Sequence, residues 1–125
     1  GQELVQLGAT ADGEGAVTTL NGEGKILVQL RTMEDGQGMV ATLNGEGQIL
    51  VELGATVSGG AVRTLNGEGQ TLVQLGTTDQ GEGMVSTLNG EGKELVRLGS
   101  TKNGVGAVAV FDPSAKRAPG ILMPR

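Results

Sequence analysis

The residues of this chain that could do chemistry are carboxylates in glycine-rich turns. The stretches ADGEG, EDGQG and NGEG place Asp, Glu and Asn oxygens close together, and calcium prefers such hard oxygen ligands. The pattern lacks the alternating acids and the late Glu of an EF-hand, and it also differs from the glycine-rich calcium-binding nonapeptide. We therefore expect solvated acids that keep the protein soluble, with calcium binding as the less favoured alternative.

The sequence contains few side chains that could support other kinds of catalysis. The sequence contains no His, Cys, Tyr or Trp, so the usual acid–base and nucleophilic groups are missing. Paired catalytic carboxylates need two unlike environments, whereas these acids recur in near-identical turns. The segment GEGK resembles part of a phosphate-binding loop, but Lys25 and Lys93 are followed by Ile and Glu instead of Ser or Thr. We predict no enzyme, and no catalytic, cofactor-binding or metal-binding residues.

Composition and charge exclude several classes of partner. The net charge is −5 and the nine Lys and Arg residues are scattered, so no nucleic-acid ligand is expected. No apolar run approaches the roughly 20 residues of a membrane-spanning helix. The chain begins at Gly1, in phase with Gly24, which suggests a piece cut from a longer protein at a repeat boundary.

An internal repeat organises the carboxylates. The word TLNGEG occurs four times, and the sequence divides into units of about 23 residues. In phase, the five units are GQELVQLGATADGEGAVTTLNGE, GKILVQLRTMEDGQGMVATLNGE, GQILVELGATVSGGAVRTLNGE, GQTLVQLGTTDQGEGMVSTLNGE and GKELVRLGSTKNGVGAVAVFDPS. We assign residues 1–111 to a five-repeat β array, and residues 112–125, which contain all three prolines, to a C-terminal cap, linker or docking tail.

Each unit is expected to hold two short strands, such as residues 26–30 and 39–43, separated by a glycine-rich loop and followed by the NGEG turn. In the fifth unit Asp112 and Pro113 replace this turn and are typical of a type I turn. The second glycine of NGEG, for example Gly24, is then expected in the left-handed conformation that closes a bulged turn. The third unit has a one-residue deletion in the other loop, which we expect to tolerate changes of length.

Alternation along the strands predicts two faces. Val17 and Thr19, and likewise Val28 and Leu30, are expected to face inward, while Gln29 and Arg63 mark the outer side. That outer side also carries a large apolar residue in every copy. Strand twist could bury each of these residues under a neighbouring loop, and the alternative is burial against another chain. The expected self-association residues are Leu4, Leu27, Leu50, Leu72 and Leu95 in the first strands, and Leu20, Leu43, Leu65, Leu88 and Phe111 in the second strands.

Two architectures satisfy this pattern. In a single-chain β-solenoid each unit is one coil, and the turn asparagines, for example Asn21, stack as a ladder. In an intertwined homotrimer each unit contributes strands to a shared narrow core. The motifs LVQLG and GMVSTLNGEG over residues 1–111 resemble the trimeric β-repeat shafts of viral, phage and bacterial surface fibres, of the triple β-spiral or triple-stranded β-helix type. That resemblance implies an elongated, extracellular or virion-borne homotrimer, and we favour it over the solenoid.

Three functional hypotheses follow. The first is a structural shaft that self-associates and spaces or anchors an attached domain. The second is a solenoid module that binds calcium or a carbohydrate. The third is a subunit of an extracellular filament, in which the tail segment GILM docks on the next copy.

Overall fold

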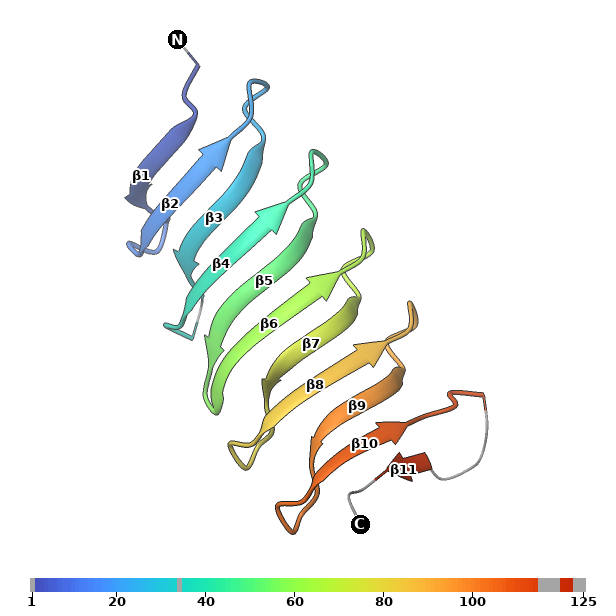
Figure 1. The fold of residues 1–125 in the computed structure, drawn as a ribbon. Helices are drawn as coiled ribbons and strands as arrows, with labels where there is room; N and C mark the ends of the chain where they lie inside the picture. The colour runs from blue at the N-terminus through green and yellow to red at the C-terminus, as the bar shows by residue number, and fades with distance from the viewer. Residues whose placement is uncertain (1, 34, 115–119, 123–125) are drawn as a thin grey trace.

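The computed structural model describes residues 2–33, 35–114 and 120–122, and these form one antiparallel sheet without a helix (Figure 1). The glycine-led β-repeat predicted from the sequence is thereby confirmed at the level of an all-β fold. The strands are β1 (Val5–Ala9), β2 (Gly15–Leu20), β3 (Ile26–Thr32), β4 (Gly38–Leu43), β5 (Ile49–Thr56), β6 (Gly59–Leu65), β7 (Thr71–Thr77), β8 (Gly83–Leu88), β9 (Glu94–Ser100), β10 (Gly106–Val110) and β11 (Gly120–Leu122).

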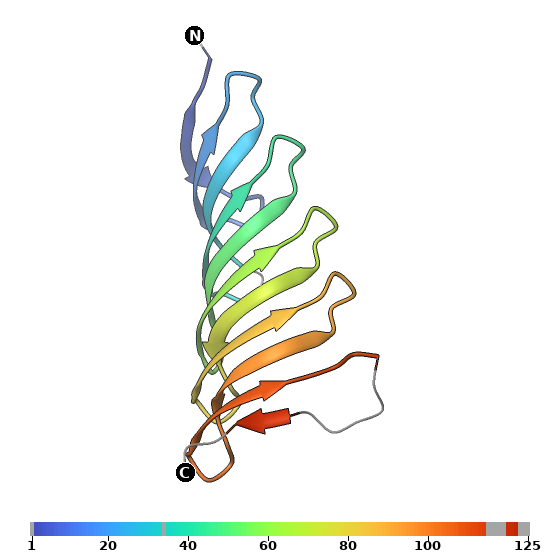
Figure 2. The same ribbon diagram turned by 45° about the vertical axis from the view of Figure 1, so that its right-hand side comes forward.

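The sheet is a meander in which each strand pairs with its neighbours in sequence, from β1 to β11. The described strands form a single layer that is twisted into a long ribbon, with the two ends of the chain at opposite ends of the ribbon (Figure 2). The solenoid alternative is therefore wrong, because neighbouring strands are antiparallel hairpin partners and not successive coils. In the tail, β11 pairs with β10 of the same chain, and residues 115–119 and 123–125 lie outside the described residues.

The repeated word NGEG forms a tight hairpin turn, as the sequence predicts. In the first copy the Gly24 N–H donates to the Asn21 carbonyl (3.0 Å), and Gly24 has φ +78°. The side chain of Asn21 accepts from the backbone N–H groups of Glu23 (3.0 Å) and Lys25 (2.9 Å). Each asparagine therefore holds its own turn, and the expected asparagine ladder is not formed. In the fifth copy Asp112 takes this role and accepts from the Ser114 N–H (2.9 Å).

A register shift follows each NGEG turn. It lies beside Leu20, Leu43, Leu65 and Leu88, where one strand carries an extra residue. Such bulges increase the twist of a sheet locally, so their recurrence in each of the first four units contributes to the twisted ribbon.

The loops at the other edge of the sheet use nearly the same turn. Thr10 takes the place of Asn, and Gly13, with φ +83°, donates its N–H to the Thr10 carbonyl (2.9 Å). The one-residue deletion in the third copy shortens this loop to a turn between Thr56 and Gly59. A β-carbon at Gly59 would lie 2.8 Å from the side chain of Thr77, so the shorter turn requires glycine there.

Within the single chain, the expected burial of the inner and outer faces is reversed. The face that carries Val17 and Leu30 is the more exposed one, and Leu30 is 50% exposed. The face expected to point outward holds the buried residues Thr18, Ala41 and Ser86, and Ala41 is fully buried. We call the first the apolar face and the second the polar face.

Cross-strand neighbours explain why the polar face is buried. Ala41 pairs with Gln29 on one side and with Glu52 on the other, and the stems of such long side chains cover a small residue between them. Ser86 lies in the same way between Gln74 and Arg97. The apolar face has no comparable alternation of long polar and small residues, and no second layer of described residues lies over it.

The chain consequently has a very small core. Met39 and Ala41 are the buried hydrophobic residues among those described. The chain exposes 8420 Å², whereas a compact monomer of 12.6 kDa exposes about 6,200 Å². This excess of roughly 2,200 Å² is the surface that a second layer would cover in a compact protein.

Candidate self-association surface

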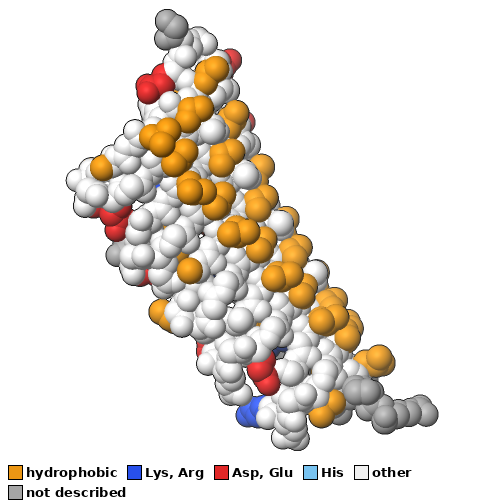
Figure 3. Space-filling model, turned by 60° about the vertical axis from the view of Figure 1, so that its left-hand side comes forward, with side chains coloured by type: hydrophobic (Ala, Val, Ile, Leu, Met, Phe, Trp, Pro, Cys, Tyr) orange, Lys and Arg blue, Asp and Glu red, His pale blue; other side chains and the backbone are white. Residues whose placement is uncertain are grey.

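A continuous apolar stripe runs along the ribbon from its N-terminal to its C-terminal end (Figure 3). The register places one residue of each strand in a single row on the apolar face, because each is paired with the next across the sheet. This leucine–valine row consists of Leu7, Val17, Leu30, Val40, Leu53, Val62, Leu75, Val85, Leu98, Val108 and Leu122.

The leucines of this row are left half open to solvent. Leu53, Leu75 and Leu98 are 53%, 52% and 54% exposed, and Leu7 at the end of the ribbon is 78% exposed. Scattered single apolar residues are normal on a protein surface, but a contiguous apolar patch of this length marks an interaction site.

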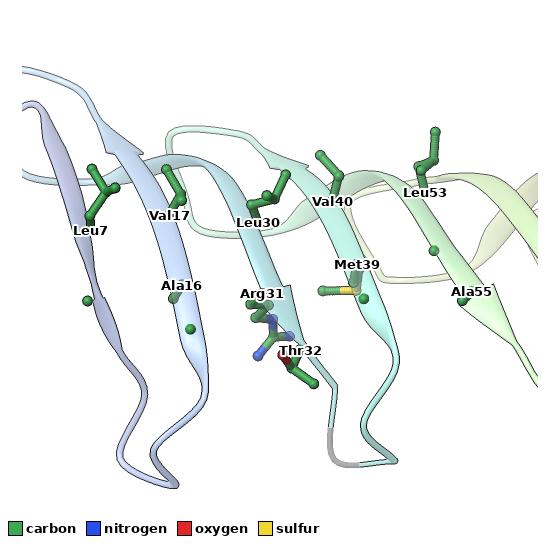
Figure 4. A pocket seen from close by; sticks show the side chains of 14 residues that line it. Leu7, Ala16, Val17, Leu30, Arg31, Thr32, Met39, Val40, Leu53 and Ala55 are labelled. Carbon is green, nitrogen blue, oxygen red and sulfur yellow. The ribbon is translucent and has the colours of Figure 1, made fainter.

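A row of small residues lies beside the leucine–valine row on the same face. Its paired positions are Ala9 with Gly15, Thr32 with Gly38, Ala55 with Gly60, Thr77 with Gly83, and Ser100 with Gly106. We call it the glycine furrow. Over the first five strands the two rows line an open groove of about 730 Å³, and residues at ladder positions of the polar face, among them Arg31 and Met39, also contribute to its lining. Leu7, Val17, Leu30, Val40 and Leu53 project from one side of their strands along it (Figure 4).

Charged side chains are absent from the ladder positions of the apolar face in the described strands. The charges in the strands lie on the polar face, where Arg63 is 3.6 Å from Glu52 and Arg97 is 2.8 Å from Glu94. The side chains at these ladder positions can therefore be covered without removing a charge from water, which is the main cost of burying a polar surface.

The self-association residues predicted from the sequence lie elsewhere. By strand alternation and register they line the polar face near the NGEG turns. There the Leu20 N–H donates to the Leu4 carbonyl and the Phe111 N–H donates to the Leu95 carbonyl. Nine of the ten are half-buried within the chain, and Leu4 is 54% exposed. Their role in self-association stays a prediction. For the leucine–valine row the sequence predicts an inward orientation, as in the shared core of the trimer, whereas the ten self-association residues are expected on the opposite face.

The turn acids are spread along one edge of the sheet. The glutamates of successive NGEG turns are two strands apart, which is about 10 Å. Lys25 lies 3.5 Å from Glu23 and Lys93 lies 2.8 Å from Glu91. The hydrogen bond and charge of Lys93 lower the pKa of the Glu91 carboxyl. Among the described residues, no three His, Cys, Asp or Glu side chains come together as a metal site.

The NGEG turns of the second and third copies are linked by a glutamine side chain. Gln48 accepts from the side chain of Asn44 (2.7 Å) and donates to the carbonyl of Gly67 in the next turn along the edge. The second copy is therefore joined to the third by a side chain as well as by the backbone ladder.

The fold and surface define a class of protein, an all-β repeat with a single sheet and one unpartnered apolar face. In the part of the chain that the structure describes, no helix is long and apolar enough to cross a membrane. Comparisons with models of known protein families and with curated protein sequences found no match.

Proposed function

We propose that this chain is a structural protein, a shaft segment that self-associates through its apolar face and holds an attached domain at a distance from a surface. The observation that carries the proposal is the leucine–valine row, which is continuous along the ribbon, free of charge and about half exposed at each central leucine. Covering an apolar surface is the main favourable contribution to protein association.

The amount of uncovered surface supports an obligate assembly. The excess of roughly 2,200 Å² per chain is in the range that permanent interfaces bury and exceeds the surface of a transient contact. A chain with so small a core gains from association the apolar burial that its own single layer does not provide.

We further propose a homotrimer, located outside the cell or on a virion, in which three ribbons turn their apolar faces toward a common axis. The resemblance of the repeat to trimeric fibre shafts supports three copies. In such an assembly the polar faces and the charged turns stay in water, which agrees with a chain of net charge −5.

The length of the ribbon fits a spacer. Adjacent strands are about 4.8 Å apart, so each two-strand unit adds about 10 Å to the ribbon. A variant that lacks one unit, residues 24–46, is expected to keep its number of copies and to shorten by about 10 Å in small-angle X-ray scattering.

Light scattering of the purified chain at low concentration, with and without EDTA, tests the proposal. We expect three times the chain mass of 12.6 kDa, unchanged by EDTA. A monomer at all concentrations would contradict self-association, and a mass that depends on EDTA would favour a calcium-stabilised module.

A further inference from the structure

Four glycines at the starts of strands are not required by the fold of the chain itself. Gly15, Gly38, Gly83 and Gly106 do not have positive φ angles, and a β-carbon added at any of them would meet no atom within 4 Å. Glycine weakens a strand. A glycine in a strand often marks a bulge, a tight bend, or a site where a ligand or another backbone approaches closely, and the ladders at these four glycines carry no bulge.

These glycines all lie in the furrow beside the leucine–valine row. The turn glycines differ, because Gly24 and Gly69 have φ +78° and are explained by their own turns. On the polar face, Gly54 and Gly99 are also explained, because a β-carbon there would lie 3.3 Å from a backbone carbonyl. Among the glycines of the described strands, those with open space and ordinary backbone are thus concentrated on the exposed apolar face, with Gly8 on β1 as the exception.

We propose that the leucine–valine row of one copy of the chain packs into the glycine furrow of a second copy. This inference rests on the proposed self-association and names the contact that would produce it. Each exposed leucine, such as Leu53 or Leu75, would enter a space that the furrow leaves open because it has no side chain at Gly38 or Gly83.

A second copy of the chain is the occupant that the geometry favours, because a partner must present side chains at the same spacing as the glycines of the furrow. Leucines recur in every second strand of the row, and glycines recur in every second strand of the furrow. Both spacings are therefore two strands, about 10 Å. A copy of this chain has that spacing along the described strands β1 to β10, and the ladder positions of its apolar face bring no charge into the contact.

Symmetry makes the same contact possible for two or three copies. A rotation axis parallel to the ribbon carries the row of one copy to the side where the next copy has its furrow. A rotation axis perpendicular to the ribbon would instead place the leucine–valine row of one copy against the leucine–valine row of the other. The inference therefore predicts parallel chains, with contacting residues at the same level of the ribbon.

Disulfide cross-linking tests the contact directly, because the chain has no cysteine. One chain carries Leu75→Cys in the row and another carries Gly83→Cys in the furrow, on the neighbouring strand. The two are refolded together and oxidised. We expect the mixed disulfide to exceed both self-pairs severalfold. Self-pairing of Leu75→Cys chains in preference to the mixed pair would overturn the inference.

Filling the furrow provides a second test with a matched control on the same hairpin. Gly15→Leu fills the furrow, whereas Gly8→Leu places the same side chain on the polar face, and both sites have open space and φ values that are not positive. We expect Gly15→Leu, and more strongly the double variant Gly38→Leu/Gly83→Leu, to raise the concentration at half association at least tenfold. Gly8→Leu should leave it unchanged.

The outcomes separate the two proposals. If the unaltered chain is oligomeric and the furrow variants associate equally well, the furrow contact is wrong while self-association stands. If the unaltered chain is monomeric, both proposals are wrong. If the furrow variants lose the circular dichroism signal of the sheet, they have unfolded. The disulfide cross-linking result then decides whether the furrow contact is correct.

Discussion

Replacing two exposed leucines of the leucine–valine row by threonine is expected to weaken association without breaking the strands. Leu53 is 53% exposed and Leu75 is 52% exposed, so about half of each side chain remains to be buried. Full burial of a leucine contributes about 1.5–3 kcal/mol, and half of it therefore contributes about 1 kcal/mol. The double variant Leu53→Thr/Leu75→Thr loses roughly 2 kcal/mol per chain, or roughly 6 kcal/mol in the proposed trimer.

This loss has a measurable effect on assembly. About 6 kcal/mol raises the dissociation constant of the trimer about 10,000-fold. Because that constant varies with the square of concentration, the midpoint of association rises about 100-fold. Sedimentation velocity over a dilution series measures the midpoint, and circular dichroism reports whether the strands persist. Threonine suits the test because it favours strands and already occupies this face at Thr42 and Thr64.

The control variant removes the same side chains from the other face. Leu50 and Leu72 belong to the set that the sequence predicts for self-association, and both are half-buried within the chain. We expect Leu50→Thr/Leu72→Thr to lower the melting temperature while the midpoint of association changes little. The reasoning from exposure would be refuted if this variant dissociated and the Leu53→Thr/Leu75→Thr variant kept the mass of the unaltered chain.

Three further changes test the turns and their charges. Gly69→Ala places a β-carbon at φ +78° with open space around it, so denaturant titration should show an unfolding free energy lower by about 1–2 kcal/mol; Gly8→Ala, at an ordinary φ, should not lower it. Asn66→Ala removes the acceptor of two backbone N–H groups and should cost about 1–2 kcal/mol. Asn66→Asp keeps that acceptor and should cost less, and equal losses would show that the acceptor does not hold the turn. Lys93→Met removes the cation that lowers the pKa of Glu91, so an NMR titration should find that pKa higher than in the unaltered chain. Because the folded-state pKa is lowered, the pair stabilises the fold above the unfolded-state pKa and loses this effect as the pH falls through the folded-state value, a dependence that the variant should lack.

The turns and strands could be predicted because their causes are local. The left-handed conformation at Gly24 follows from the spacing within NGEG, and the strand at residues 39–43 follows from its β-branched residues between two glycine-rich segments. What the pattern did not reveal is that Thr10 and Asn21 begin nearly the same turn at opposite edges, so that one hairpin geometry recurs about every 11 residues.

The faces could not be predicted because burial here depends on cross-strand neighbours. Arg63 indicated an outer side, since an arginine must reach water. In the sheet it lies 3.6 Å from Glu52, in the same row as Ala41, which longer neighbours cover. The expectation that valine and leucine point inward assumes a second layer to pack against, and the described strands form only one.

The repeat also bears on how copies would find their alignment. A slip of one unit between two parallel ribbons would preserve the match of row and furrow, because both recur every two strands. It would, however, leave about two strands of apolar face uncovered at each end, and the lost burial grows with every further unit of slip. Full overlap is therefore the most stable alignment even for nearly identical units. The number of repeats would then set the length of the ribbon and the strength of its association together, which is a useful property in a spacer.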